Sequence, residues 1–515
     1  MTHGPLSSHI NGARSDEFLY GTDIMSSSEQ PSRQDARVST GVPGLDSVLG
    51  GGLVASGVYI VVGEPGAGKT LFANQLCYHQ GRAGARCLYV TLLAESHARM
   101  LANMRDMAFF DSALLPEGVY YVSGFRMLEE QGLPGLLELL RREVRNHNAS
   151  ILVLDGLVQA QEAAGSSRDF KKFIHELQVA AGLARFTALM LTSANGPAVH
   201  PEYTMVDGIL ELRERTFGVR SWRELQVRKF RGSATLQGVH TFRISNEGLE
   251  VFPRLEARVS RAPPPDPGAL RVHFGVPSLD ALFPEGLAAG STSLLLGPPG
   301  AGKTMLGCSF LYEGLKQGES CLLMGFYEPP NRLLGKVASA GIDLGGASQD
   351  GQLGILWQPP SECVLDILAE QLLTEVQRRK VKRVFVDGLS AIQQSSPDPL
   401  RMNSFFAALT QALRATGTTT LFSMETPRLF GPVLDVPMEV GPSAVAENLF
   451  FLRHVELDGR LRRLLSIFKM RDTHYDPTLR EFVITPKGIE VLPPFNIAVD
   501  TLLTGLARHP GTGHF

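Results

Sequence analysis

The sequence predicts an α/β protein made of two tandem copies of one domain, each a mainly parallel β-sheet flanked by helices. Two observations predict this fold class. Motifs of the first half return in the second half at a nearly constant offset, and short apolar runs alternate with longer mixed segments in both halves. Alternation of strands and helices is typical of a parallel sheet that is covered on both faces.

The duplication is visible from the start of each half. Residues 41–46 (GVPGLD) recur as 275–280 (GVPSLD), and the same offset relates Gly68-Lys69-Thr70 to Gly302-Lys303-Thr304. Further along the chain the offset drifts, as loop insertions and deletions produce. A sequence that repeats over such a length predicts two domains of the same fold.

The individual elements follow from the hydrophobic pattern. Apolar runs predict strands at 58–62, 87–92, 151–154, 188–191 and 384–386, and mixed segments predict helices at 71–80 and 169–183. The runs 151–154 and 384–386 are wholly apolar, as central strands of a parallel sheet are when both of their faces are buried.

A proline-rich stretch at 261–268 separates the halves, because prolines disfavour both helix and central strand. The polar N-terminal segment lacks apolar periodicity, so we expect it to be disordered. The expected organisation is a disordered tail at 1–36, a first domain at 37–255, a linker at 256–270, a second domain at 271–495 and a short tail at 496–515.

Each half carries the phosphate-binding motif G-x-x-x-x-G-K-T between a strand-like run and a helix-like one. Glycines let backbone N–H groups surround a phosphate at a helix N-terminus, the lysine reaches the outer phosphates and the threonine hydroxyl serves Mg²⁺. The predicted nucleotide-binding residues are Gly63, Gly66, Gly68, Lys69 and Thr70 in the first half, and Gly297, Gly300, Gly302, Lys303 and Thr304 in the second.

Asp155 and Asp387 each end an apolar strand downstream of a P-loop and precede Gly-Leu. A second carboxylate at this place can hold Mg²⁺ through its water shell, together with Thr70 or Thr304. The alternative is that each aspartate only caps the turn that follows its strand.

Composition excludes several classes of protein. The formal net charge of −3 gives no electrostatic reason for tight binding to nucleic acid or to an anionic membrane. The chain lacks an apolar stretch long enough to span a bilayer and lacks a signal-peptide core, so we expect it in the cytoplasm. The five cysteines form no CxxC pair, so neither a disulfide framework nor a zinc site is indicated.

Motifs near the start and the end of each half resemble those of a known protein family. The GVPxLD segment, the Gly-Leu pair before each P-loop and Phe468-Lys469-Met470-Arg471 resemble the KaiC family of RecA-like ATPases and autokinases, over about 37–495. The resemblance implies two RecA-like domains that bind ATP with Mg²⁺, in a hexamer that has ATP between its subunits. A signalling partner is also implied, but the sequence does not identify it.

Three further sets of residues follow from this resemblance. A Lys-x-Arg pair on a late strand is expected to reach the phosphates of the neighbouring subunit, here as Lys229 with Arg231 and Lys469 with Arg471. A solvated basic strand edge is the alternative.

The family also places two glutamates after the strand that follows the P-loop helix, the first as general base. Here the matching positions are Ala94-Glu95 and Tyr327-Glu328, so one carboxylate is left in each half. Glu95 and Glu328 are candidates for orienting the nucleophile, against the alternative of solvated loop carboxylates. The family has adjacent serine and threonine phosphoacceptors in its second domain. At the matching positions this chain has Ser443 and Ala444, so Ser443 is a candidate phosphoacceptor.

We therefore expect a hydrolysing ATPase switch, with Ser/Thr autokinase activity in the second domain as a further hypothesis. Two alternatives stay open. One is a DNA-binding recombination accessory protein, although the predicted channel loops at 161–168 and 426–431 carry one arginine each. The other is a nucleotide-binding scaffold with negligible turnover, which the missing first glutamates suggest.

Overall fold

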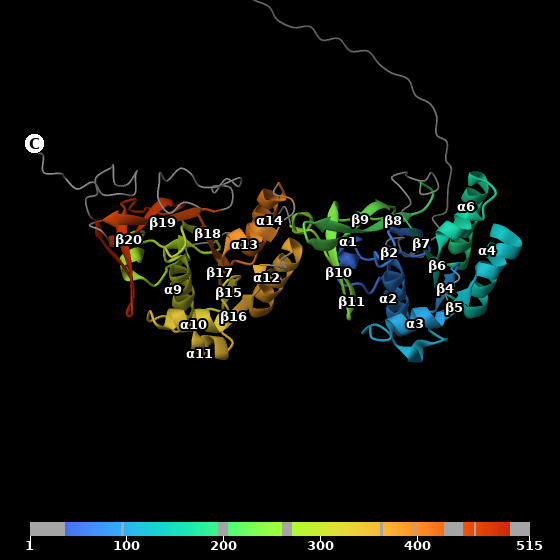
Figure 1. Cartoon of the computed structure of the whole chain (residues 1–515), viewed down its shortest axis with the longest axis horizontal. Helices are drawn as coiled ribbons and strands as arrows, with labels where there is room; N and C mark the ends of the chain where they lie inside the picture. The colour runs from blue at the N-terminus through green and yellow to red at the C-terminus, as the bar shows by residue number, and fades with distance from the viewer. Residues whose placement is uncertain are drawn as a thin grey trace, which may run out of the picture.

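The computed structural model describes residues 37–93, 97–193, 204–259, 270–360, 364–395, 398, 400–426, 446–457 and 460–494. Each half of the chain forms a 9-stranded sheet, and the two domains lie side by side along the long axis of the molecule (Figure 1). The predicted fold class, two tandem α/β domains, is confirmed. Among the described residues no helix has the length and the apolar character needed to cross a bilayer.

The first sheet joins a parallel part to an antiparallel edge. Across the sheet its strands are β11 (Gly248–Phe252), β10 (Val239–Ser245), β9 (Arg220–Phe230), β8 (Gly208–Phe217), β3 (Val58–Gly63), β7 (Thr187–Ser193), β6 (Ile151–Asp155), β4 (Cys87–Thr91) and β5 (Val119–Ser123). Pairing is parallel from β8 to β5 and antiparallel from β8 to β11. The sheet is therefore mainly parallel, as predicted.

The second sheet repeats this arrangement. Its strands are β16 (Leu353–Trp357), β15 (Cys321–Gly325), β17 (Arg383–Asp387), β18 (Thr419–Glu425), β14 (Thr292–Gly297), β19 (Asn448–Leu457), β20 (Arg460–Lys469), β21 (Arg480–Thr485) and β22 (Gly488–Pro494). A small two-stranded sheet precedes each large one, β1 (Arg37–Val38) with β2 (Leu53–Val54), and β12 (Arg271–Val272) with β13 (Leu287–Ala288).

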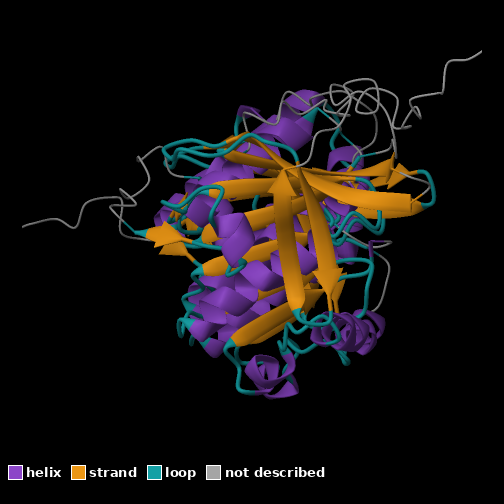
Figure 2. Cartoon of the chain, turned by 90° about the vertical axis from the view of Figure 1, so that its left-hand side faces the viewer, coloured by secondary structure: helices purple, strands orange, loops and turns teal. Residues whose placement is uncertain are grey.

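Helices cover both faces of each sheet, as the view along the molecule shows for the second domain (Figure 2). The first half has α1 (Leu45–Val48), α2 (Lys69–Arg82), α3 (His97–Met104), the 3-10 turn η1 (Ser112–Leu114), α4 (Phe125–His147), α5 (Leu157–Glu162) and α6 (Ser167–Ala184). The second half has α8 (Pro277–Asp280), α9 (Lys303–Lys316), α10 (Pro330–Ala338), α11 (Gly345–Gln349), α12 (Leu365–Arg379), α13 (Leu389–Ser395) and α14 (Arg401–Ala415).

The two-sided cover explains why the central strands are wholly apolar. On β3, Ile60 packs in the core shared with α4 and α6, whereas its neighbour Val61 packs in the core shared with α2. On β14, Leu294 and Leu295 divide in the same way between the α12–α14 side and the α9 side. Successive residues of a strand face opposite sides, so both kinds of position must be hydrophobic here.

The repeated GVPxLD segment is explained by its aspartate. Asp46 accepts hydrogen bonds from the backbone N–H of Thr40 at 2.9 Å and from its hydroxyl at 2.7 Å. Asp280 accepts from the backbone N–H groups of Phe274 at 2.9 Å and Gly275 at 3.0 Å. In each domain the carboxylate thus binds the segment just before the short helix that carries it, so this motif has a structural role.

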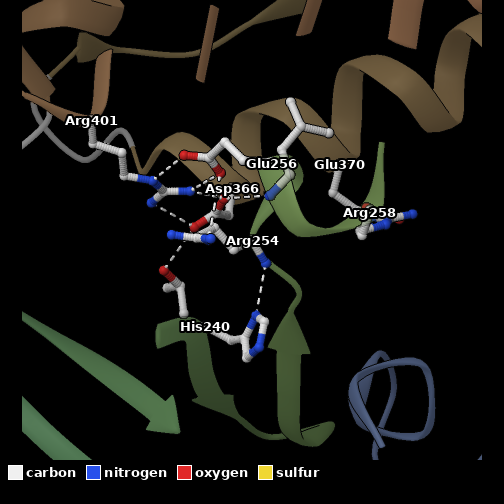
Figure 3. Close-up of polar contacts among 9 residues, drawn as sticks. His240, Arg254, Glu256, Arg258, Asp366, Glu370 and Arg401 are labelled. Atoms are coloured by element: carbon white, nitrogen blue, oxygen red, sulfur yellow. Dashed lines mark hydrogen bonds and ion pairs between the residues drawn. The ribbon is translucent and has the colours of Figure 1, made fainter. Parts of the chain in front are cut away.

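A short helix, α7 (Leu255–Arg258), leaves the first domain and packs on the second. Leu255 belongs to the hydrophobic core formed with α12 and α14, and Arg401 of α14 binds both Glu256 and Asp366 (Figure 3). Thr241 on β10 also donates to Asp366, at 3.2 Å. The domains are thus joined by buried polar and apolar contacts around α7.

Candidate functional site

Both P-loops connect a central strand to a helix with the same local geometry. In the first domain β3 ends at Gly63 and α2 begins at Lys69, with Gly68 at φ 100° as its N-cap. In the second domain β14 ends at Gly297 and α9 begins at Lys303, with Gly302 at φ 102°. This left-handed backbone suits glycine and turns N–H groups toward the helix entrance, where an anionic phosphate is stabilised.

Close packing also requires glycine at the N-cap. A Cβ atom at Gly68 would lie 2.8 Å from Ile244 Cδ1, and one at Gly302 would lie 2.6 Å from Phe482 Cε1. Both partners belong to the antiparallel edge of their sheet. The two N-cap glycines therefore serve the contact between loop and sheet, in addition to the phosphate-binding role that the motif predicts.

The P-loop lysines are held at the carboxyl ends of their strands. Lys69 Nζ donates to the carbonyls of Gly63 at 2.8 Å and Glu64 at 2.9 Å. Lys303 Nζ donates to Gly297 and Pro298 at the same two distances. In each domain the ammonium lies where the outer phosphates of a nucleotide would meet the loop.

Burial lowers the pKa of both lysines below the ordinary value. The Asp155 carboxylate partly offsets this effect for Lys69, and the Glu425 and Asp387 carboxylates do so for Lys303. A desolvated ammonium interacts more strongly with a phosphate than one in water does, because the local dielectric constant is lower.

The predicted aspartates lie beside the P-loop threonines. Asp155 ends β6 and its Oδ2 accepts from Thr70 Oγ1 at 3.1 Å, while Asp387 ends β17 and its Oδ2 accepts from Thr304 Oγ1 at 2.7 Å. Each pair offers only oxygen donors, one hydroxyl and one carboxylate. This donor set fits Mg²⁺, which prefers oxygen ligands and keeps several waters.

A second hydroxyl orients each aspartate, and it comes from a different strand in each domain. Tyr89 on β4 donates to Asp155 Oδ2 at 2.8 Å, and Ser423 on β18 donates to Asp387 Oδ1 at 2.5 Å. Burial raises the pKa of Tyr89, with the Asp155 charge acting in the same direction, so the phenol stays protonated as a donor. The sequence did not predict either residue.

The lysines of the Lys-x-Arg pairs lie three residues back from the strand ends where the P-loops begin. Lys229 pairs with Ile209 near the start of β8, whereas Gly63 pairs with Leu212 farther along the same strand. Lys469 pairs with Leu449 near the start of β19 in the same way. A strand rises about 3.3 Å per residue, so each lysine lies about 10 Å back from the strand end at which the P-loop of its own domain begins.

Each pair is anchored to backbone carbonyls in the segment before β8 or β19. Arg231 donates to Thr204 and Met205 at 3.3 and 3.4 Å, and Lys469 donates to Ala446 at 3.2 Å. Burial lowers the pKa of Lys229 and of Lys469, and the neighbouring arginine acts in the same direction.

Other cations of the antiparallel edge contact the P-loop of their own domain. Arg223 Nη1 donates to the Gly66 carbonyl at 3.4 Å, and its counterpart Arg463 donates through Nε to Gly300 at 2.9 Å. In the second domain His454 Nε2 also lies 3.3 Å from the Pro299 carbonyl. These contacts depend on the pairing of β8 with β9 and of β19 with β20, which no local motif reveals.

Of the two candidate glutamates, Glu328 lies within the described residues and Glu95 does not. Glu328 follows β15 and forms an ion pair of 3.0 Å with Lys336 of α10. Glu95 and the candidate phosphoacceptor Ser443 lie outside the described residues. The catalytic roles of Glu95 and Glu328 and the phosphorylation of Ser443 stay predictions.

The chain resembles known proteins over most of its length. The family model described as "ATPase: KaiC" matches residues 38–256 and again residues 272–496. The circadian clock oscillator protein KaiC of Picosynechococcus sp. is 26% identical over 476 residues, which cover 89% of this chain and 90% of that protein.

Two further relatives are similar to the same extent. The circadian clock oscillator protein KaiC of Thermosynechococcus vestitus is 26% identical over 486 residues, 91% of this chain and 92% of its own. The circadian clock protein KaiC3 of Synechocystis sp. is 26% identical over 482 residues, 89% and 92%. Because the family model covers both halves of the chain, the protein belongs to the KaiC family of ATPases.

Proposed function

We propose that this protein binds ATP with Mg²⁺ at both P-loops and hydrolyses it as a slow molecular switch. The observation that carries the proposal is the hydrogen bond between P-loop threonine and strand-end aspartate, Thr70 to Asp155 and Thr304 to Asp387, beside the P-loop lysine in both domains. If these loops were only turns, nothing would require a carboxylate beside the P-loop threonine in both domains.

In each domain different residues have different roles in phosphoryl transfer. Backbone N–H groups of the P-loop cradle the phosphates, and Lys69 or Lys303 neutralises their outer oxygens. Bound Mg²⁺, held by Thr70 with Asp155 or Thr304 with Asp387, would supply further positive charge at the phosphates. Glu95 and Glu328 are proposed to orient the nucleophile, since positioning and electrostatics dominate this reaction.

We further propose that ATP lies between subunits of a ring, for which six subunits is the expected number. The family resemblance of Lys229, Arg231, Lys469 and Arg471 supports this arrangement. So does the register, in which Lys229 and Lys469 lie three residues, about 10 Å, back from the strand ends where the P-loops begin. Cations on the transferring phosphoryl group stabilise the charge that develops there. ATP binding would then favour assembly, because the full set of contacts exists only in the assembled ring.

We also propose that the second domain phosphorylates its own Ser443. Ser443 precedes β19 in the sequence, Lys469 ends the following strand β20, and Ser443 matches the serine of the family's phosphoacceptor pair. Ala444 cannot accept phosphate, so the second domain would carry at most one of the two acceptors. Such a protein would signal through its nucleotide state, with or without one phosphoserine, to a partner that is still to be identified.

One incubation separates these activities. Purified protein is incubated with γ-labelled ATP and Mg²⁺, and released phosphate and protein-bound label are followed together. We expect released phosphate that is absent in the Lys69→Ala, Lys303→Ala double variant, and bound label that is absent in Ser443→Ala. Release of phosphate without bound label would leave an ATPase switch without autokinase activity.

The scaffold alternative makes the opposite prediction. If the wild type released no more phosphate than the folded double variant, the ATPase proposal would fail. Subunit mixing tests the ring: inactive Lys303→Ala, Lys69→Ala chains mixed with inactive Arg231→Ala, Arg471→Ala chains should regain turnover. Mixed rings that stay inactive would contradict the placement of ATP between subunits.

A further inference from the structure

In the second domain a carboxylate outside the predicted site residues lies next to the P-loop. Glu425 is the last residue of β18, and β18 is the direct neighbour of the P-loop strand β14. The register places Glu425 opposite Gly297, the residue from which the P-loop departs. Its carboxylate therefore stands at the carboxyl edge of the sheet, where ligands of open α/β sheets bind.

Hydrogen bonds fix how close Glu425 is to the phosphate end of the site. The Gly297 carbonyl accepts from Lys303 Nζ at 2.8 Å and also from the backbone N–H of Thr426 at 3.1 Å. The P-loop ammonium and the end of β18 thus share one carbonyl oxygen. In agreement with this contact, the Glu425 charge counteracts the effect of burial on the pKa of Lys303.

The direction of the Glu425 side chain follows from strand geometry. Ser423, two residues earlier on β18, donates to Asp387 Oδ1 at 2.5 Å, on the face of the sheet that α9 covers. Residues two apart on a strand point to the same face. Glu425 therefore faces the side that holds Asp387, Thr304 and the start of α9, and it is exposed at that edge.

Glu328, the candidate that the family resemblance gives, starts from a strand farther from the P-loop. Glu328 follows β15, and β17 and β18 lie between β15 and the P-loop strand β14. Neighbouring strands are about 4.8 Å apart, so Glu425 departs from the strand next to the P-loop and Glu328 from the third strand over. Glu328 is also engaged by Lys336 at 3.0 Å.

We propose that Glu425 is the general base of the second domain and takes the place of the glutamate that Tyr327 replaces. This inference rests on the proposed hydrolysis of ATP in that domain. A water oxygen forms a bond to the γ-phosphorus while the bond from that phosphorus to the bridging oxygen breaks. The proton of the water passes to the Glu425 carboxylate and from there to the departing phosphate, which leaves ADP and inorganic phosphate.

The first domain offers a natural comparison at the same place. Ser193 ends β7 and pairs with Gly63, as Glu425 ends β18 and pairs with Gly297. A serine hydroxyl is a far weaker base than a carboxylate at neutral pH. The two sites of one chain thus differ at the residue beside the P-loop, and only the second has a base there.

The test uses the full chain with one site silenced at a time. In a Lys69→Ala background, where the second domain turns over alone, Glu425→Gln should lower kcat by about 100-fold, the usual contribution of a general base. ATP binding, measured with a fluorescent ATP analogue, should stay the same or become tighter because a negative charge near the phosphates is removed. Glu425→Asp should retain an intermediate kcat.

The matched control places the same substitution in a Lys303→Ala background, where only the first domain turns over. There Glu425→Gln should leave the rate unchanged. The inference would be overturned by an unchanged kcat in the Lys69→Ala background, by a loss of ATP binding that accounts for the loss of rate, or by an equal effect in both backgrounds. A Lys69→Ala chain that shows no turnover with Glu425 intact would instead refute hydrolysis in the second domain, and this inference with it.

Discussion

The guanidinium of Arg401 binds the Glu256 carboxylate through two hydrogen bonds of 2.8 Å each, and so ties the end of the first domain to α14 of the second (Figure 3). The same guanidinium binds Asp366 at 2.6 and 3.0 Å. Burial would lower the pKa of Arg401 and raise that of Glu256, but their mutual hydrogen bonds reverse both shifts. Both groups therefore stay charged at the junction.

Replacing Arg401 should destabilise the junction strongly. The side chain of Asp366 is 0% exposed, so Arg401→Ala leaves a buried carboxylate without its cation. We expect a loss of about 3–5 kcal/mol in the free energy of unfolding, measured by chemical denaturation.

Arg258 offers a matched control, because it pairs with Glu370 across the same junction while both side chains are more than a third exposed. Arg258→Ala should cost no more than about 1 kcal/mol. Similar losses in the two variants would show that the Arg401 cluster does not hold the domains together.

His240 should make the stability of the junction depend on pH. Its Nδ1 accepts from the Arg254 N–H at 2.9 Å and its Nε2 donates to the Leu236 carbonyl at 3.1 Å, so the ring is neutral. Burial lowers the pKa of His240 below its ordinary value of about 6.5. Its stabilising effect is therefore present in full above about pH 6.5 and declines as the pH falls toward the lower pKa of the folded state.

Thermal unfolding at pH 7.5 and pH 5.5 measures this dependence. His240→Gln keeps a donor for Leu236 but cannot take up a proton, so it should be less stable than the wild type at pH 7.5 and lose less on acidification. His97 and His454 also have lowered pKa values and contribute to the slope that remains. A slope that is unchanged in His240→Gln would refute the assignment.

Tyr89→Phe should weaken the first nucleotide site with little change in packing. The substitution removes one hydrogen bond to the Asp155 carboxylate, and bonds to charged groups contribute about 1.5–3 kcal/mol. In a Lys303→Ala background we expect a lower melting temperature and a higher Mg²⁺ concentration for half-maximal turnover.

Tyr121→Phe is the control for this prediction. Tyr121 contacts the Tyr89 ring, but its hydroxyl donates to Asn74 and not to Asp155. Its removal should leave the Mg²⁺ dependence unchanged. The same shift in Mg²⁺ dependence for both variants would mean that the hydroxyl of Tyr89 has no specific role at Asp155.

Residues that belong to a local sequence pattern could be identified as candidates, and their roles stay predictions. The P-loops, Asp155 and Asp387 stand out because the phosphate cradle and the strand end are formed by neighbours in the chain, and because both recur. The predicted strands at 58–62 and 151–154 and the helix at 71–80 are confirmed, with small differences at their ends.

Residues whose roles depend on strand order could not be predicted. Ser423 lies directly opposite Asp387 on the neighbouring strand, but the corresponding neighbour of Asp155 is Leu191, which has no donor. The longer side chain of Tyr89 reaches Asp155 from the strand on the other side. Nothing in the sequence shows that two unlike residues on different strands have the same task.

The contacts between the two domains could not be predicted either, since the residues that form them lie far apart in the chain. Glu256, Asp366 and Arg401 meet only when α7, α12 and α14 are packed together. The boundaries proposed at 37, 255, 271 and 495 stay predictions, and α7 shows that the first residues of the proposed linker form a helix against the second domain.

The central claim is that one chain holds two separate ATP sites. The most direct test is the number of ATP molecules bound per chain in the presence of Mg²⁺, measured by equilibrium dialysis for the wild type, Lys69→Ala, Lys303→Ala and the double variant. We expect two, one, one and none, in that order. A wild type that binds a single ATP, or a double variant that still binds ATP with wild-type affinity, would refute two separate P-loop sites.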